Sequence, residues 1–138
     1  MNKVNINELY TLAAQKGIET HSVKCPKSKA IALELENCPF IGMDRSVFKS
    51  EYTERLVLAH ELGHVLTGGY YSDIANPVNV KRMEHRAVKK TVEMLIPEEE
   101  LSQKLHEEVT VFELSQHFDV PEDLIKKALW IYYRKEIA

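Results

Sequence analysis

The sequence predicts an α+β fold in a single domain, with one small antiparallel sheet packed against helices. Three observations support this. Apolar residues recur at helical spacing near the N-terminus, short candidate strands fill residues 20–44, and the rest of the chain is helical in character. A chain of 138 residues with 44% hydrophobic side chains is long enough to form a core.

The first predicted element is an amphipathic helix over residues 5–17 with Gly17 as its C-terminal stop. Its apolar positions at helical spacing are Ile6, Leu9, Tyr10, Ala13 and Ala14. The candidate strands that follow cover residues 21–24, 30–36 and 40–44. Residues 37–39, which include Pro39, are expected to turn the chain between the last two strands.

Helices are predicted for the remainder, over residues 51–67, 79–96, 98–105, 110–118 and 121–135. The first of these ends at Gly68, and the third begins with three glutamates, which suit a helix N-terminus. Thr110 and Glu113 match a capping box. We find no repeat and no linker, so we expect one domain over residues 1–138. Its core would span 1–105, followed by a helix-turn-helix-like segment over 106–138.

Charge and hydropathy exclude several classes of protein. With 18 Lys+Arg against 21 Asp+Glu, the net charge of −3 argues against a protein that coats nucleic acid. DNA binding by the last helix is not expected either, because its cations exceed its acids by only one. The apolar runs fall far short of the roughly 18 residues needed to span a bilayer. A polar N-terminus and two unpaired structural thiols, Cys25 and Cys38, predict a cytoplasmic protein.

The most informative stretch is residues 60–64, which read His-Glu-Leu-Gly-His. Residues four apart lie on one face of a helix, so His60 and His64 can bind one cation, while Glu61 lies about 100° round the helix. From there Glu61 could reach a metal-bound water without filling a coordination position. A chance match is expected only about 0.03 times in this composition. The pattern therefore favours a zinc site over two ordinary histidines.

A catalytic zinc site needs a third protein ligand and one open position. Glu84 is the best candidate, because it lies in the apolar stripe of the predicted helix over 79–96, where a buried carboxylate is costly without a partner. A buried salt bridge of Glu84 with an Arg or Lys is the alternative. The fallback ligands are His85, His106 and His117. Thr67 and Tyr70 exclude the longer metzincin motif, which needs Gly and His there.

Residues 58–64 (LAHELGH), 84–87 (EHRA) and 93–97 (EMLIP) together resemble the ImmA/IrrE family of zinc metallopeptidases. Members typically carry an AHELGH helix, followed by an E-x-x-A segment that closes on an L-L-M-P-like end. Residues 111–120 resemble the C-terminal part of the family, so the resemblance covers most of the chain. The family usually has Asn after that Ala and then a Phe-Ala pair; this chain has Val88, Lys90 and Thr91.

The resemblance implies a zincin-like, thermolysin-type helical core. His60, His64 and Glu84 would bind one Zn²⁺ per chain in a gluzincin-like site, and Glu61 would act as the general base. Peptide hydrolysis also needs a hydrogen-bond donor to the oxyanion that develops on the attacked carbonyl, and the candidates are Tyr70, Tyr71 and His85.

The resemblance also implies a phage or mobile-element regulator that acts on a helix-turn-helix repressor to relieve repression. We expect a metalloendopeptidase that cleaves this repressor. The alternative is a zinc-stabilised regulator that binds and displaces the repressor without cutting it.

Overall fold

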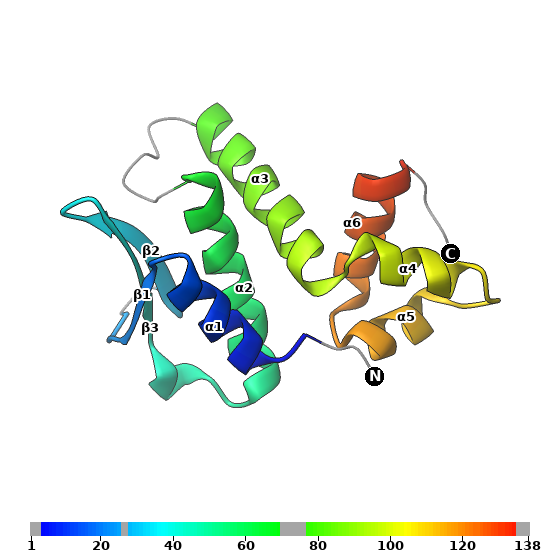
Figure 1. Cartoon of the computed structure of the whole chain (residues 1–138), viewed down its shortest axis with the longest axis horizontal. Helices are drawn as coiled ribbons and strands as arrows, with labels where there is room; N and C mark the ends of the chain where they lie inside the picture. The colour runs from blue at the N-terminus through cyan, green and yellow to red at the C-terminus, as the bar shows by residue number, and fades with distance from the viewer. Residues whose placement is uncertain (1–3, 26–27, 70–76, 135–138) are drawn as a thin grey trace. The chain divides into compact units, whose positions relative to one another are not determined.

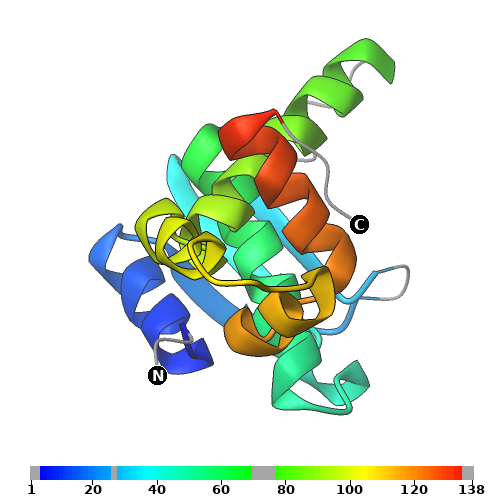
Figure 2. The ribbon, with the colours of Figure 1, turned by 90° about the vertical axis from the view of Figure 1, so that its right-hand side faces the viewer.

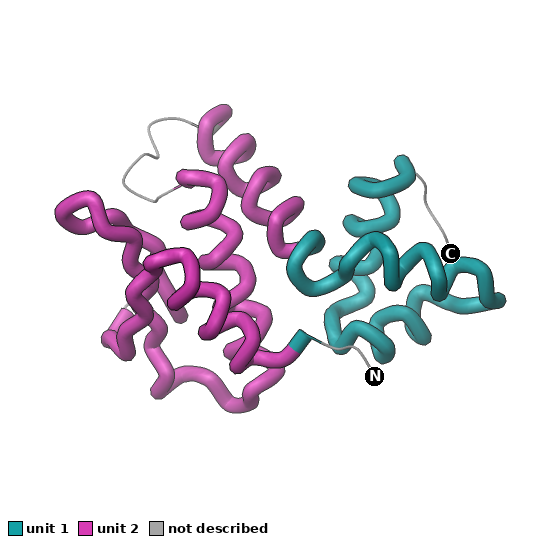
Figure 3. Tube along the Cα trace, in the orientation of Figure 1, with its two compact units in different colours: residues 1–4, 92–138 teal, residues 5–91 magenta. Residues whose placement is uncertain are grey.

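The computed structural model describes residues 4–25, 28–69 and 77–134 (Figure 1). The chain divides into two compact units (Figure 3). The N-terminal unit is Asn5–Thr91, and the C-terminal unit is Val92–Ala138 together with the first four residues. The described residues form six α-helices and one three-stranded sheet, which confirms the α+β class. The single domain over residues 1–138 stays a prediction.

The sheet of the N-terminal unit is mixed, with strand order β1-β3-β2. Its strands are β1 (Glu19–Ser22), β2 (Ala30–Leu35) and β3 (Cys38–Met43). β2 and β3 pair antiparallel as a hairpin, whereas β1 runs parallel to β3, with Glu19 opposite Phe40. The prediction of an antiparallel sheet was therefore wrong for β1. A strand's alternation of apolar and polar residues indicates its buried face, but not the direction of its partner.

The hairpin turn lies one residue earlier than expected. Glu36 and Asn37 have φ angles of 51° and 65°, the positive values of a two-residue type I′ turn. Cys38 and Pro39, which we expected in the turn, belong to β3. Pro39 is tolerated there because it lies near the start of the strand, and the pairing of β3 with β1 begins only at Phe40.

Two helices of this unit cover one face of the sheet (Figures 1 and 2). α1 (Ile6–Gln15) packs on β1 and on α2, and α2 (Glu51–Thr67) packs on β2 and β3. The side chain of Ser50 accepts a hydrogen bond from the amide of Thr53 at the start of α2, and Gly68 ends the helix with φ 75°. Leu58, Leu62 and Val65 of α2 are buried.

The long helix α3 (Pro77–Leu95) begins two residues before its predicted start. It runs from the N-terminal unit into the C-terminal unit. Among the described residues, no helix is both long and apolar enough to cross a membrane.

The C-terminal unit adds α4 (Glu98–Leu105), α5 (Val111–Phe118) and α6 (Glu122–Tyr133). The predicted capping box of Thr110 and Glu113 is present at the start of α5. His117 on α5 pairs with Glu100 on α4 at 2.5 Å, and the Tyr132 hydroxyl of α6 donates to the Ile96 carbonyl at 2.8 Å. Burial, with weaker contributions from nearby carboxylates, raises the pKa of Tyr132 to about 12. These contacts tie the helices of the unit together.

A short 3-10 helix, η1 (Arg45–Val47), joins β3 to α2 and was not predicted. The buried carboxylate of Asp44 starts it, accepting hydrogen bonds from the Ser46 amide at 3.2 Å, the Ser46 hydroxyl at 2.5 Å and the Cys25 amide at 3.0 Å. The hydrogen bonds from Ser46, followed by that from Cys25, hold the pKa of Asp44 below its ordinary value of 3.8. Asp44 thus fixes the connection that leads into α2.

The lowered pKa of Asp44 predicts a pH-dependent contribution to stability. The ionised carboxylate stabilises the fold above its unfolded-state pKa of 3.8, and this contribution is lost as pH falls through the lower folded-state pKa. Asp44→Asn keeps an acceptor oxygen but cannot ionise. We expect it to be less stable than the wild type at pH 7 in urea unfolding, with a difference that shrinks below about pH 4. A difference that stays constant with pH would contradict this role.

Candidate metal centre

The two histidines of the sequence motif lie one turn apart on α2, with their rings directed at one point. The Nε2 atoms of His60 and His64 are 3.2 Å apart, and the rings meet edge to face at 86°. The His64 side chain is 1% exposed, whereas that of His60 is 32% exposed. One imidazole is therefore fixed inside the unit, and the other borders solvent.

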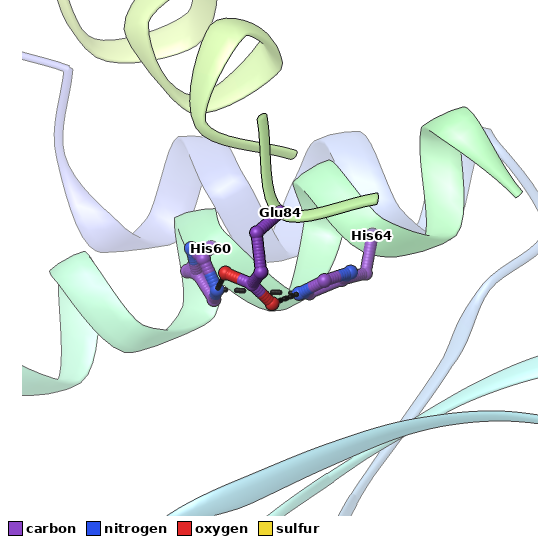
Figure 4. A group of neighbouring side chains, drawn as sticks. All are labelled: His60, His64 and Glu84. Atoms are coloured by element: carbon purple, nitrogen blue, oxygen red, sulfur yellow. Dashed lines mark hydrogen bonds and ion pairs between the residues drawn. The ribbon is translucent and has the colours of Figure 1, made fainter. Parts of the chain in front are cut away.

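Glu84 on α3 supplies the third side chain, and its carboxylate lies between the two imidazoles (Figure 4). Its Oε2 is 3.2 Å from Nε2 of His60, and its Oε1 is 2.9 Å from Nε2 of His64. The Glu84 side chain is 45% exposed, so it is less buried than the sequence suggested. In the described structure, Glu84 pairs with these two imidazoles. The sequence analysis had considered a buried salt bridge of Glu84 with an Arg or Lys as the alternative to metal binding.

The arrangement can hold a metal ion. The three side chains each offer a ligand atom, and these atoms all lie within 4.8 Å of one another. Bonds of about 2.0–2.2 Å around a tetrahedral zinc would place neighbouring donors about 3.4 Å apart, close to the observed contacts. Two imidazoles with one carboxylate form the donor set of a catalytic zinc site, which leaves a fourth position for water. The residues present therefore fit the ion that the sequence predicted.

Glu61 lies on the same helix between the two histidines and is only 4% exposed. It does not belong to the group of ligating side chains, in keeping with its expected place round the helix. Cys25, from the segment after β1, lies within electrostatic range of Glu61. Burial raises the pKa of the Cys25 thiol, and the carboxylates of Asp44 and Glu61 raise it further. Cys25 is thus held as a thiol, as expected of a structural cysteine.

A comparison with models of protein families matches residues 8–129 to Peptidase_M78, the IrrE N-terminal-like domain. The chain belongs to this family. The match confirms the resemblance seen in the sequence and supports a metallopeptidase-like, metal-binding protein. No curated protein and no solved structure matches the chain. The thermolysin-type core stays a prediction.

In this member of the family, α2 and α3 are in close contact at Gly63, and the sequence analysis missed this contact. A Cβ atom on Gly63 would lie 2.5 Å from the Ala87 carbonyl oxygen and 3.1 Å from the Thr91 hydroxyl. Only glycine therefore allows α2 and α3 to approach this closely. The available signal was a glycine inside a regular helical pattern, which often marks close packing.

Among the remaining candidates, the three histidines that the structure describes do not join the group. Tyr70 and Tyr71 lie outside the described residues. His85 is exposed on α3, His106 is exposed at the end of α4, and His117 pairs with Glu100. Within the described parts of the chain, His60, His64 and Glu84 are the one group of three or more side chains that could hold a metal. The fallback ligands are therefore not needed.

Proposed function

We propose that this protein is a zinc-dependent metalloendopeptidase of the cytoplasm that cleaves a helix-turn-helix repressor, relieving repression of a phage or mobile element. The convergence of Glu84 with His60 and His64, beside the buried Glu61, carries the proposal. Membership of the family supports the peptidase class. The repressor and the phage context rest on the sequence resemblance.

In this proposal the Nε2 atoms of His60 and His64 and the Glu84 carboxylate hold the zinc ion. When bound, zinc would lower the pKa of a coordinated water towards about 7 and polarise a peptide carbonyl. The Glu61 carboxylate takes a proton from the attacking water and passes it to the leaving amine. Glu61 directly follows His60 on α2 and is buried, and this burial limits the positions that its carboxylate can adopt.

The chemistry also needs a donor to the developing oxyanion. We propose Tyr70, Tyr71 or His85 for this role, because all three are close in sequence to the ligands. His85 follows Glu84 directly on α3, and its side chain is exposed. The partial exposure of His60 and Glu84 gives a peptide segment access to the site.

The test uses the full chain and the helix-turn-helix repressor that the proposal implies, sought among the products of neighbouring genes. Protein purified with zinc available should contain about one zinc per chain and should shorten the repressor, as seen by mass spectrometry. Removal of the metal with a chelator should stop the cleavage, and added zinc should restore it. Loss of operator binding by an intact repressor would instead favour the non-proteolytic regulator. A protein without zinc would contradict both.

A further inference from the structure

We propose that Thr91 is a positioning residue of the metal centre. Its hydroxyl ties α3 to α2 and thereby holds the Glu84 carboxylate between the two imidazoles. The inference rests on the metal-binding part of the proposed function, and it does not depend on the peptidase activity.

The contacts of Thr91 join the two helices. Thr91 is 5% exposed, and its Oγ1 lies 2.8 Å from the carbonyl oxygen of Ala87, on its own helix, and 3.3 Å from that of Ala59, on α2. The first contact is the usual bond of a helical threonine to the residue four positions earlier. The second contact spans the helix interface. The hydroxyl proton is thus shared between one carbonyl on each helix.

Thr91 lies at the point where the backbones are closest. The space that a side chain on Gly63 would fill is bounded by the Ala87 carbonyl and by the Thr91 hydroxyl itself. No side chain of α2 therefore separates the helices here, and the hydroxyl bridges directly from α3 to the α2 backbone. Removing the hydroxyl leaves packing alone to keep the two backbones together.

The bridge lies next to a ligand on α2 and two helical turns from Glu84 on α3. On α2, Ala59 directly precedes His60. On α3, Thr91 lies seven residues after Glu84, so Thr91 and Glu84 lie on the same face of that helix. Glu84 is nearly half exposed, so its position relies on its helix more than on surrounding side chains. A binding site must hold its ligands within about 0.5 Å of the productive geometry. A small separation of the helices at Thr91 would therefore weaken metal binding.

The experiment compares variants of Thr91 with the wild type by two measurements. The first is zinc affinity, measured by competition with a chromophoric chelator, and the second is the visible spectrum of the Co²⁺-substituted protein. Thr91→Val keeps the shape of the side chain and removes the hydroxyl. We expect it to bind zinc about tenfold more weakly or worse, the usual scale for residues that support metal ligands, and to show an altered Co²⁺ spectrum. Thr91→Ser keeps the hydroxyl and should restore affinity to within about threefold of the wild type.

Thr67→Val is the matched control. The Thr67 hydroxyl also bonds backbone carbonyls, those of Gly63 at 2.7 Å and His64 at 3.3 Å, but both lie on its own helix. This variant should bind zinc like the wild type. Unfolding of the metal-free proteins shows whether any variant is merely less stable.

Wild-type zinc affinity and an unchanged Co²⁺ spectrum in Thr91→Val would overturn the inference, whatever its stability. If Thr91→Val does not fold, Thr91→Ala is compared with Thr91→Ser. Equal zinc affinities of these two variants would then overturn the inference. A wild-type protein that binds zinc and cleaves no repressor would contradict the proposed peptidase and leave the role of Thr91 intact.

Discussion

Glu61→Gln is expected to slow cleavage of the repressor severely while leaving about one zinc ion per chain. The amide has the size of the carboxylate but cannot take a proton from water. A general base contributes typically about 10²–10⁴ to the rate, so we expect a loss of that order in the rate of repressor shortening. Zinc content should not change, because Glu61 is not among the three side chains that could hold a metal ion.

Glu54→Gln is the matched control for this variant. Glu54 lies two turns earlier on the same helix, and its carboxylate accepts a hydrogen bond from the Tyr10 hydroxyl at 2.6 Å. We expect this variant to keep wild-type cleavage. If Glu61→Gln cleaves at the wild-type rate, another residue is the base. If it relieves repression without cleavage, the protein acts by binding.

Gly63→Ala is expected to weaken zinc binding. Its new methyl group would lie 2.5 Å from the Ala87 carbonyl oxygen, and backbone cannot move aside as a flexible side chain can. α3 must then shift and carry Glu84 away from the imidazoles. Overpacking of this kind costs about 1–3 kcal/mol, so urea unfolding should also show lower stability.

Gly69→Ala provides the control, because a Cβ there would meet His64 Nδ1 and the Met83 side chain at 3.5 Å, an ordinary contact distance. Zinc affinity and stability should stay near those of the wild type. Unchanged zinc affinity in Gly63→Ala would show that the close approach of the helices does not position Glu84.

Local patterns in the sequence predicted most of the elements. The helices over 51–67 and 98–105 have the predicted limits, because glycine, proline and acidic residues mark helix ends within a few positions. The parallel pairing of β1 was not predictable in this way, since it depends on a partner strand about twenty residues away. The turn at Glu36 and Asn37 was predicted one residue too late because it lacks the glycine that usually signals a type I′ turn.

In the metal centre, too, local patterns were predictable, whereas contacts between distant segments were not. Helical spacing alone placed His60 and His64 on one face, and the cost of a buried carboxylate pointed to Glu84. The contacts of Gly63 and Thr91 were not predicted, because they depend on which faces two helices present to each other. That choice is made by tertiary packing and leaves no fixed spacing between the residues involved.

All three donor atoms, the Glu61 carboxylate and the contact at Gly63 belong to the N-terminal unit. In the described part of the C-terminal unit no residue contributes a donor. The distances among the donors are therefore set by contacts within one unit. We therefore expect that substitutions in α4, α5 and α6 displace no ligand, which would let the two parts of the chain evolve at different rates.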